Sequence, residues 1–129
     1  MASGTDEATA TRVADLLKLV ANPNRLRILY LLAQGECSVS EVEQRLGIRQ
    51  PTLSQQLGAL RSGGVVSTRR EHKAVFYDLT EPRLRTLLSA VEDILIAERP
   101  PRRLPARSPE ARARALGQAA MFGRIGDEP

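Results

Sequence analysis

Apolar residues recur every three or four positions along most of this chain, which is the spacing of one face of a helix. Residues 7–21 carry such a stripe and predict a first helix. The sequence Asn22-Pro23-Asn24 interrupts it, and residues 25–33 follow with apolar side chains on most sides. Because a helix that is apolar all round belongs in a core, we expect this second helix to lie at the centre of the fold.

A third, short helix is predicted from its cap. Ser38 and Glu41 stand three residues apart, as in a capping box, and Gly47 ends the segment. A tight turn at residues 47–50 leads into a further helix, and we assign its first helical position to Pro51. Two short helices joined by a glycine-containing turn are typical of a helix-turn-helix.

The helix that begins at Pro51 has two faces of different chemistry. Leu53, Leu57 and Leu60 face a core, whereas the opposite face carries amides and hydroxyls instead of the Lys and Glu of an ordinary solvated surface. Such groups suit base edges in the major groove, where Gln can form two hydrogen bonds with adenine. We therefore expect DNA contacts from the turn and from this polar face, at Arg49, Gln50, Thr52, Ser54, Gln55 and Gln56.

Two segments of strand-forming residues, 65–68 and 74–79, predict a β-hairpin after this helix. The residues between them, Arg69-Arg70-Glu71-His72-Lys73, are assigned to its turn. Cations beside a polar helix can grip phosphates, so the hairpin adds Arg69, Arg70, His72 and Lys73 to the predicted DNA-binding residues. His72 equally fits a solvated turn residue, and this alternative stays open.

The last predicted helix starts at Pro82 and keeps an unbroken apolar stripe over residues 84–95. Together with the stripe of the first helix, it predicts a two-fold dimer through the first and last helices. Packing of the last helix on its own hairpin is the alternative. The predicted interface consists of Val13, Leu16, Leu17, Val20, Leu84, Leu87, Leu88, Val91, Ile94 and Leu95.

Composition divides the chain into three segments. Residues 1–7 are expected to be disordered, residues 8–98 to form the domain, and residues 99–129 to form a mobile tail rich in Arg and Pro. Residues 1–98 hold 12 Lys and Arg against 12 Asp and Glu, so the net charge of +4 lies in the tail. The local cations of the hairpin therefore favour DNA binding more than the overall charge does. A solvated role and a contact with the DNA backbone both remain open for the tail arginines.

The sequence also excludes several function classes. No apolar run approaches the roughly 18 residues of a membrane span, and no secretory signal is visible, so we expect a cytoplasmic protein. We find no nucleophile with a neighbouring base, no glycine-rich phosphate loop and no cluster of metal ligands, and we expect neither an enzyme nor a cofactor. The rival interpretation is a dimeric module that binds protein instead of specific DNA, which an acidic or apolar recognition face would favour.

The predicted order, helix-helix-helix-helix-strand-strand-helix, is mainly α with a small β-hairpin and describes a winged helix-turn-helix. Over about residues 12–97, including ANPNRLRILYLLAQGECSVSEVEQRLGIRQPTLSQQLGALRSGGVVSTRREHKAVFYDLT, the chain resembles the ArsR/SmtB family of bacterial repressors. Its PTLSQQL helix and TRREHKAVFY hairpin are similar to those of the biofilm-growth-associated and sulfide-responsive branch. The resemblance implies a homodimer that binds a palindromic operator in double-stranded DNA and is released by an inducer.

The residues with which this family senses its inducers are replaced here. Ser38 and Ser40 stand where metal-sensing members carry a cysteine pair, and hydroxyls bind soft metals poorly. Residues 82–98 contain no His, so a zinc site on the last helix is not expected either. The two cysteines of the sulfide-responsive members align with Tyr30 and Ile96. The resemblance therefore predicts no metal site and leaves the inducer open.

Cys37 is the only thiol in the chain. One interpretation is a half-buried residue without a chemical role. The other is a redox switch, because a helix N-terminus lowers the pKa of a nearby thiol and increases its thiolate fraction. An added sulfur or oxygen at Cys37 would then tilt the recognition helix.

Overall fold

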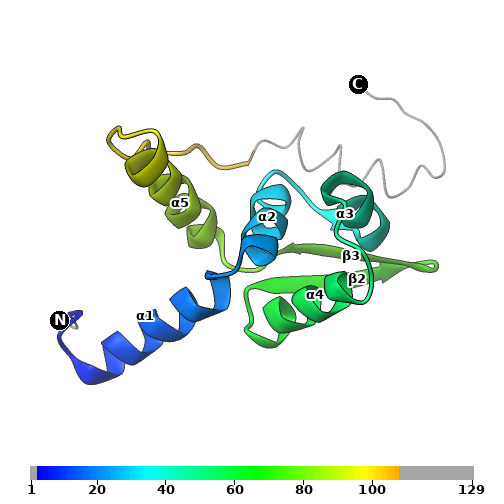
Figure 1. Ribbon diagram of the computed structural model, residues 1–129, viewed down its shortest axis with the longest axis horizontal. Coiled ribbons are helices and arrows are strands. Elements are labelled where there is room, and N and C mark those ends of the chain that lie inside the picture. Colours follow the sequence, from blue (N-terminus) through cyan, green and yellow to red (C-terminus); the bar gives the residue numbers. More distant parts are fainter. Residues whose placement is uncertain (1–2, 108–129) are drawn as a thin grey trace.

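Five α-helices and a three-stranded antiparallel sheet make up residues 3–107, the part of the chain that the computed structural model describes (Figure 1). This confirms the predicted winged helix-turn-helix. No helix within residues 3–107 has the length and apolar character needed to cross a membrane. The elements are α1 (Glu7–Val20), α2 (Pro23–Leu32), β1 (Cys37–Ser38), α3 (Val39–Leu46), α4 (Thr52–Ser62), β2 (Val66–Glu71), β3 (Ala74–Leu79), α5 (Pro82–Val91) and the π-helical turn η1 (Glu92–Ile96).

Helices α1 and α3 begin at side-chain caps, and the sequence predicts the one at Ser38. The Asp6 carboxylate accepts a hydrogen bond from the Thr9 N–H and caps α1, so helical order starts slightly before residue 8, where the domain was predicted to begin. Both arms of the capping box between Ser38 and Glu41 are present at the start of α3. Each such cap satisfies N–H groups that have no partner within the helix.

The core lies between the helix-turn-helix and the sheet, around α2. Ile28, Leu29 and Leu32 of α2 are fully buried, which confirms that this helix is central. Each buried Ile or Leu side chain contributes roughly 1.5–3 kcal/mol relative to an exposed one. The partners of α2 come from α3, α4, the sheet and α5: Val42, Leu53, Leu57, Leu60, Val66, Tyr77, Leu84 and Leu88.

The sheet contains one strand that the sequence did not predict. The two residues of β1 pair antiparallel with β3, with Cys37 opposite Tyr77 and Ser38 opposite Phe76, and the strand order is β1-β3-β2. A two-residue strand leaves no periodic pattern, which explains why a simple hairpin was expected. Because β1 leads directly into α3, it joins the wing to the first helix of the helix-turn-helix.

The turn of the hairpin is shorter than predicted. β2 continues to Glu71, so Arg69 and Arg70 are strand residues, and His72 and Lys73 alone connect Glu71 to its partner Ala74. His72 has φ 58°, in the left-handed region that two-residue hairpin turns require. Successive strand side chains point to opposite faces, so Arg69 and Arg70 lie on different faces of the wing.

The predicted dimer stripe includes residues of two kinds. Val20, Leu84 and Leu88 are buried in the core of their own chain, and Leu16 packs partly against it, so these four contribute to the core, and the interface itself stays a prediction. Such positions face inward because the small core needs them to close around α2. The stripe residues that stay exposed are Val13, Leu17, Leu87, Val91, Ile94 and Leu95.

The segment expected to begin a mobile tail contacts the folded body. Residues 99–107 turn back from the end of η1 and run toward the end of α2, as the orange segment in Figure 1 shows. Their arginines bond Asp93 and Asp78. The proline-rich composition correctly excluded a helix but carried no signal for these ion pairs. The rest of the predicted tail, from residue 108, and residues 1 and 2 lie outside the described residues.

Candidate nucleic-acid interface

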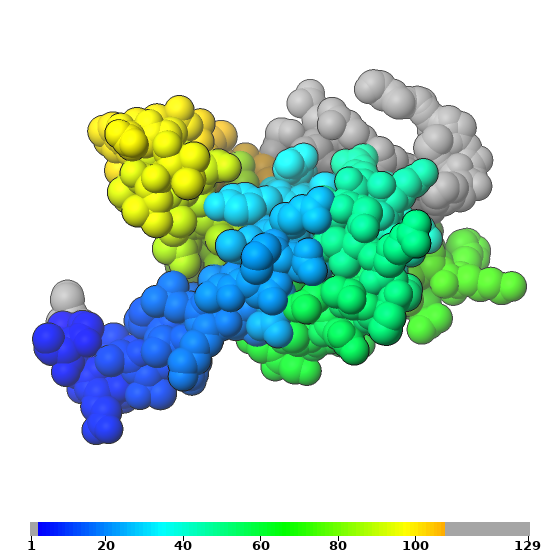
Figure 2. Space-filling view, in the orientation of Figure 1, coloured from blue at the N-terminus to red at the C-terminus, as the bar shows by residue number. Residues whose placement is uncertain are grey.

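The helix α4 presents a polar face because its apolar face is fixed in the core. Leu53, Leu57 and Leu60 are buried, whereas Ser54 and Gln55 are exposed on the other side. The helix lies beside the hairpin, and the hairpin tip projects beyond the body in Figure 2. A helix and a projecting hairpin on one surface can reach the major groove and the adjacent backbone of the same duplex.

Gln50, which was predicted to contact DNA, caps the start of α4. Its Oε1 accepts hydrogen bonds from the Ser54 N–H at 3.0 Å and from the Ser54 hydroxyl at 2.6 Å. Pro51, predicted as the first helical residue, stands at the cap position and makes no side-chain capping bond. The Gln50 amide therefore does the capping, and the Ser54 hydroxyl is already a donor to it.

Gln56 is also engaged by the protein. The Arg25 Nε donates to its Oε1 at 2.7 Å, and Arg25 Nη1 donates to the backbone oxygen of Leu19 at 3.0 Å. Arg25 thus links α4 to the end of α1. Sequence reasoning missed this residue, because an arginine 31 positions away from its partner leaves no local pattern.

Three of the predicted residues in the turn and in α4 keep their side-chain polar groups available. Within residues 3–107, Arg49, Thr52 and Gln55 make no side-chain hydrogen bond or ion pair to the protein, in contrast to Gln50, Ser54 and Gln56. Arg49 and Gln55 are exposed, and Thr52 is half-buried at the start of α4.

Arg69 is held by carboxylates of its own chain. Its Nε and Nη2 donate to Glu36 at 2.8 and 2.9 Å, and its Nη1 donates to Glu71 at 2.8 Å. The guanidinium also stacks on the Phe76 ring at 4.5 Å. These hydrogen bonds, to Glu36 first, raise the pKa of Arg69 above its ordinary value. The donors predicted for phosphate are thus already satisfied, and Arg69 holds the wing against the segment before β1.

The remaining predicted cations lie at the end of the wing. Arg70, His72 and Lys73 are all exposed, and none of them makes an ion pair to another described residue. A compact ammonium on a flexible stem, as in Lys73, can follow a phosphate as a point charge. The geometry therefore favours the wing tip, at Arg70, His72 and Lys73, over Arg69 for contacts with DNA phosphates.

Cys37 is set in a different environment from the one the sequence indicated. The side chain is buried at 5% exposure within the β1–β3 pairing, and its Sγ lies 3.7 Å from the Gly35 backbone oxygen. Burial, followed by the nearby Glu41 carboxylate, raises the thiol pKa to about 11. This direction is opposite to the lowering that the sequence suggested for a thiol near a helix start, because burial disfavours the charged thiolate.

No group of three His, Cys, Asp or Glu side chains among residues 3–107 is arranged to hold a metal ion. Ser38 and Ser40, at the positions of the family's cysteine pair, lie in the capping turn of α3, and Ser38 is committed to its cap.

Comparisons with known proteins agree with this architecture. A family model described as "Bacterial regulatory protein, arsR family" matches residues 22–68. A biofilm growth-associated repressor of Agrobacterium fabrum is 55% identical over 91 residues, which cover 70% of this chain and 78% of that protein.

Two solved structures resemble the fold. The crystal structure of the transcriptional repressor BigR from Xylella fastidiosa has a TM-score of 0.67 and 49% identity, and the match covers 73% of this chain and 96% of that one. A solution structure of a homodimeric winged helix-turn-helix DNA-binding domain from Mycobacterium bovis has a TM-score of 0.62 and 36% identity, over 76% and 93% of the two chains.

Proposed function

Because this chain belongs to the ArsR family and is a DNA-binding transcriptional regulator, we propose that it is a homodimeric repressor of a palindromic operator. The observation that carries the proposal is the pairing of an exposed polar face on α4 with an exposed cationic hairpin tip. The matched family and relatives are transcriptional regulators, and DNA binding requires no catalytic reaction. Since bacterial DNA lies in the cytoplasm, the repressor acts there.

The α4 helix enters the major groove, and its available side chains have two roles, base recognition and contact with the DNA backbone. Gln55 and Thr52 read bases, while Arg49 contacts the backbone at the start of the helix. Gln50, Ser54 and Gln56 hold the helix and its side chains in place, since their own hydrogen bonds are made within the protein. Fixed side chains lose less conformational entropy on binding, so this support increases specificity.

The wing adds contacts that do not depend on sequence. Arg70, His72 and Lys73 lie against the phosphates or the adjacent minor groove, and Arg69 positions them through Glu36. Every phosphate contact releases counterions, which makes the affinity fall steeply with salt.

A second copy of the chain covers the exposed part of the apolar stripe on α1, α5 and η1. Six stripe residues, Val13, Leu17, Leu87, Val91, Ile94 and Leu95, remain on the surface. Both α-helices lie at the end opposite the hairpin tip in Figure 1, and a groove of about 590 Å³ separates α1 from the start of α5. A self-complementary surface of this kind closes by two-fold symmetry. The two α4 helices of such a dimer then meet two half-sites, which explains a palindrome.

The proposal is tested by selecting binding sites from a random-sequence DNA library with the full chain. The selected sequences should contain an inverted repeat, and sedimentation of the complex should give two chains per duplex. Selection of a single half-site by one chain would contradict the dimer. Equal binding of selected and random duplexes would contradict the repressor and support the rival, a dimeric module that binds protein.

A further inference from the structure

Residues 99–107 form a strap that connects the C-terminal end of α5 and η1 to the base of the wing. The helix α5, which carries part of the proposed dimer interface, is called the dimer helix. The strap leaves η1 and reaches the end of α2 and β3, which is the strand at the centre of the sheet. It therefore touches two regions to which the proposed function gives different roles.

The first anchor of the strap is the carboxylate of Asp93, which is fully buried in η1. Arg99 donates to Oδ1 through Nε at 2.9 Å and Nη2 at 2.7 Å. Arg102 donates to Oδ2 through its backbone N–H at 3.1 Å and Nε at 3.0 Å. Hydrogen bonds from Arg102, with those from Arg99, lower the Asp93 pKa to about 2. A buried carboxylate without such partners would be strongly unfavourable, so η1 and the strap depend on each other.

The second anchor is Arg107, at the other end of the strap. Its Nη1 and Nη2 donate to the two carboxylate oxygens of Asp78 in β3 at 3.1 and 3.2 Å. Nη1 also donates to the backbone oxygen of Leu32 at 3.3 Å, at the end of α2. Asp78 lies opposite Ser67 of β2, close to the base of the wing. One guanidinium thus joins the central helix to the strand that carries the wing.

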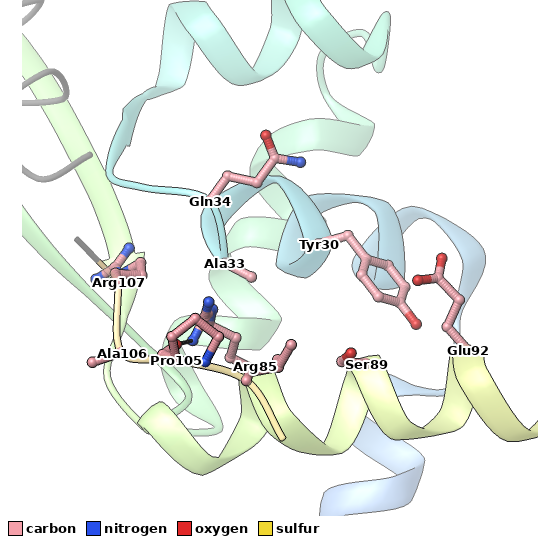
Figure 3. Close-up of a pocket in the computed structure, with 10 residues that line it drawn as sticks. Tyr30, Ala33, Gln34, Arg85, Ser89, Glu92, Pro105, Ala106 and Arg107 are labelled. Atoms are coloured by element: carbon pink, nitrogen blue, oxygen red, sulfur yellow. Dashed lines mark hydrogen bonds between the residues drawn. The ribbon is translucent and has the colours of Figure 1, made fainter. Parts of the chain in front are cut away.

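Between these anchors the strap is held by polar bonds more than by packing. A pocket of about 470 Å³ remains under it, between α2 and α5. Figure 3 shows Pro105, Ala106 and Arg107 along one side of this pocket, with Tyr30 of α2 and Ala33, the residue that follows α2, on another. The Arg85 Nη1 donates to the Pro105 backbone oxygen at 2.6 Å and supports the middle of the strap from α5. Loss of a terminal ion pair should therefore release that end.

We propose that the strap is a positioning element for DNA binding, in which Arg107 fixes the orientation of the wing relative to the dimer helix through Asp78. The proposal rests on the wing contacts of the proposed function. A hairpin that projects from the body magnifies a small rotation at its base into a larger displacement at its tip. Arg107 bonds the wing near its base, and the Asp93 anchor ties the same strap to η1, which follows α5 directly.

A double-mutant cycle on the full chain tests whether Arg107 acts through the wing tip. DNA affinity is measured for wild type, Arg107→Gln, Lys73→Ala and the double variant, with a duplex selected by the wild-type protein. Arg107→Gln should weaken binding roughly threefold or more, and it should have little further effect once Lys73 has been removed. If the Arg107–Asp78 ion pair only stabilises the fold, Arg107→Gln should weaken DNA binding by the same factor in wild type and in Lys73→Ala.

Two further variants separate positioning from a general loss of stability. Arg103 is an exposed strap arginine that makes no hydrogen bond within residues 3–107. Arg103→Gln therefore serves as the matched control, because it removes the same charge as Arg107→Gln. It should leave the DNA affinity unchanged. The charge exchange Arg107→Asp with Asp78→Arg should restore at least part of the affinity that Arg107→Asp loses. Thermal unfolding of every variant shows whether the fold persists at the assay temperature.

Each outcome decides the proposal. If Lys73→Ala alone leaves affinity unchanged, the wing contact is wrong and the strap proposal falls with it. If Lys73→Ala weakens binding but Arg107→Gln has no effect, or adds its full effect to that of Lys73→Ala, the strap proposal alone is wrong. An Arg103→Gln variant that weakens binding as much as Arg107→Gln would also overturn it, since charge and not position would then matter.

Discussion

The guanidinium of Arg69 and the carboxylate of Glu36 form a two-armed ion pair, with N–O distances of 2.8 and 2.9 Å. The pair links β2 to the segment just before β1, and Phe76 supports the guanidinium from its ring face. Two cations that are adjacent in sequence therefore have different surroundings. Arg69 is bonded to Glu36, while Arg70 on the opposite face is exposed to solvent and is available for the proposed DNA contact.

Replacement of Arg69 should lower stability more than it changes the salt dependence of DNA binding. Arg69→Ala removes a partly buried bidentate ion pair and should cost about 1–2 kcal/mol of unfolding free energy. Lys73→Ala, the matched variant at the exposed tip, should stay within about 0.5 kcal/mol of wild type. Urea unfolding measures both.

The same two variants should behave in the opposite order on DNA. Lys73→Ala should reduce the slope of log affinity against log salt by roughly one, because one phosphate contact is lost. Arg69→Ala should leave the slope nearly unchanged, even where it weakens binding. A reduction in slope for Arg69→Ala as large as that for Lys73→Ala would show that Arg69 contacts phosphate after all.

Gln55 should be the glutamine that discriminates between bases. Gln55→Ala should cost about 1–3 kcal/mol on a selected duplex and relax the preference at one base-pair position. Its affinity for random DNA should change little. Gln56→Ala is the comparison, because that side chain is bonded to Arg25 and should affect affinity without changing the preferred base. Competition binding against single-base variants of the duplex distinguishes the two results.

Charge on the exposed part of the α5 stripe should separate the two subunits. Val91 is 40% exposed, so Val91→Glu should give folded monomers with weak DNA binding, because a charge in an apolar interface is poorly compensated. Thr86→Glu adds the same charge at another exposed position of α5 and should remain dimeric. Light scattering and circular dichroism report mass and fold. An unchanged dimer for Val91→Glu would contradict this interface.

Substitution of Leu88 by Glu should have a different effect from Val91→Glu, although both residues belong to the predicted stripe. At 3% exposure, Leu88 packs in the core, so Leu88→Glu should unfold the chain and cannot test dimerisation. The stripe predicted the helix correctly, but periodicity alone does not divide a wide apolar face between the core and a partner. That division depends on how α5 lies on α2, which is set by long-range packing.

The fold was largely predictable because its determinants are local. The capping box at Ser38 and the apolar stripes indicated the helices, and their order indicated the winged helix-turn-helix. The two-residue strand β1 was missed because pairing with β3, and not local propensity, defines it.

The candidate site was predictable in residue type but not in the role of each residue. Amides and cations gather on α4 and the wing as expected. The sequence gives no sign that Gln56 is bonded to Arg25, or that Arg69 is bonded to Glu36, because these partners are 31 and 33 residues apart. Ion pairs over such distances depend on the finished fold.

Cys37 should react slowly with thiol reagents in the folded protein. Its pKa is raised from the ordinary value of 9.0 to about 11, mainly by burial. At pH 8 the thiolate fraction is then lower by a factor of about 100 than for an ordinary thiol, and burial limits access further. Alkylation by iodoacetamide at pH 8 should be at least about tenfold slower than in the urea-unfolded chain, which is the control.

The same shift predicts how stability depends on pH. The unfolded chain ionises its thiol near pH 9 and the folded chain near pH 11, so unfolding releases a proton between these values. The stability contributed by the protonated thiol is fully present below about pH 9 and is lost as the pH rises through about 11. Cys37→Ala should remove this part of the decline, which urea unfolding of both proteins at a series of pH values measures. Two results together would contradict the raised pKa: equal rates of reaction with iodoacetamide for the folded and unfolded chains, and the same pH dependence of unfolding free energy for wild type and Cys37→Ala. Cys37 would then be an ordinary thiol, and a redox switch at this residue would again be a reasonable interpretation.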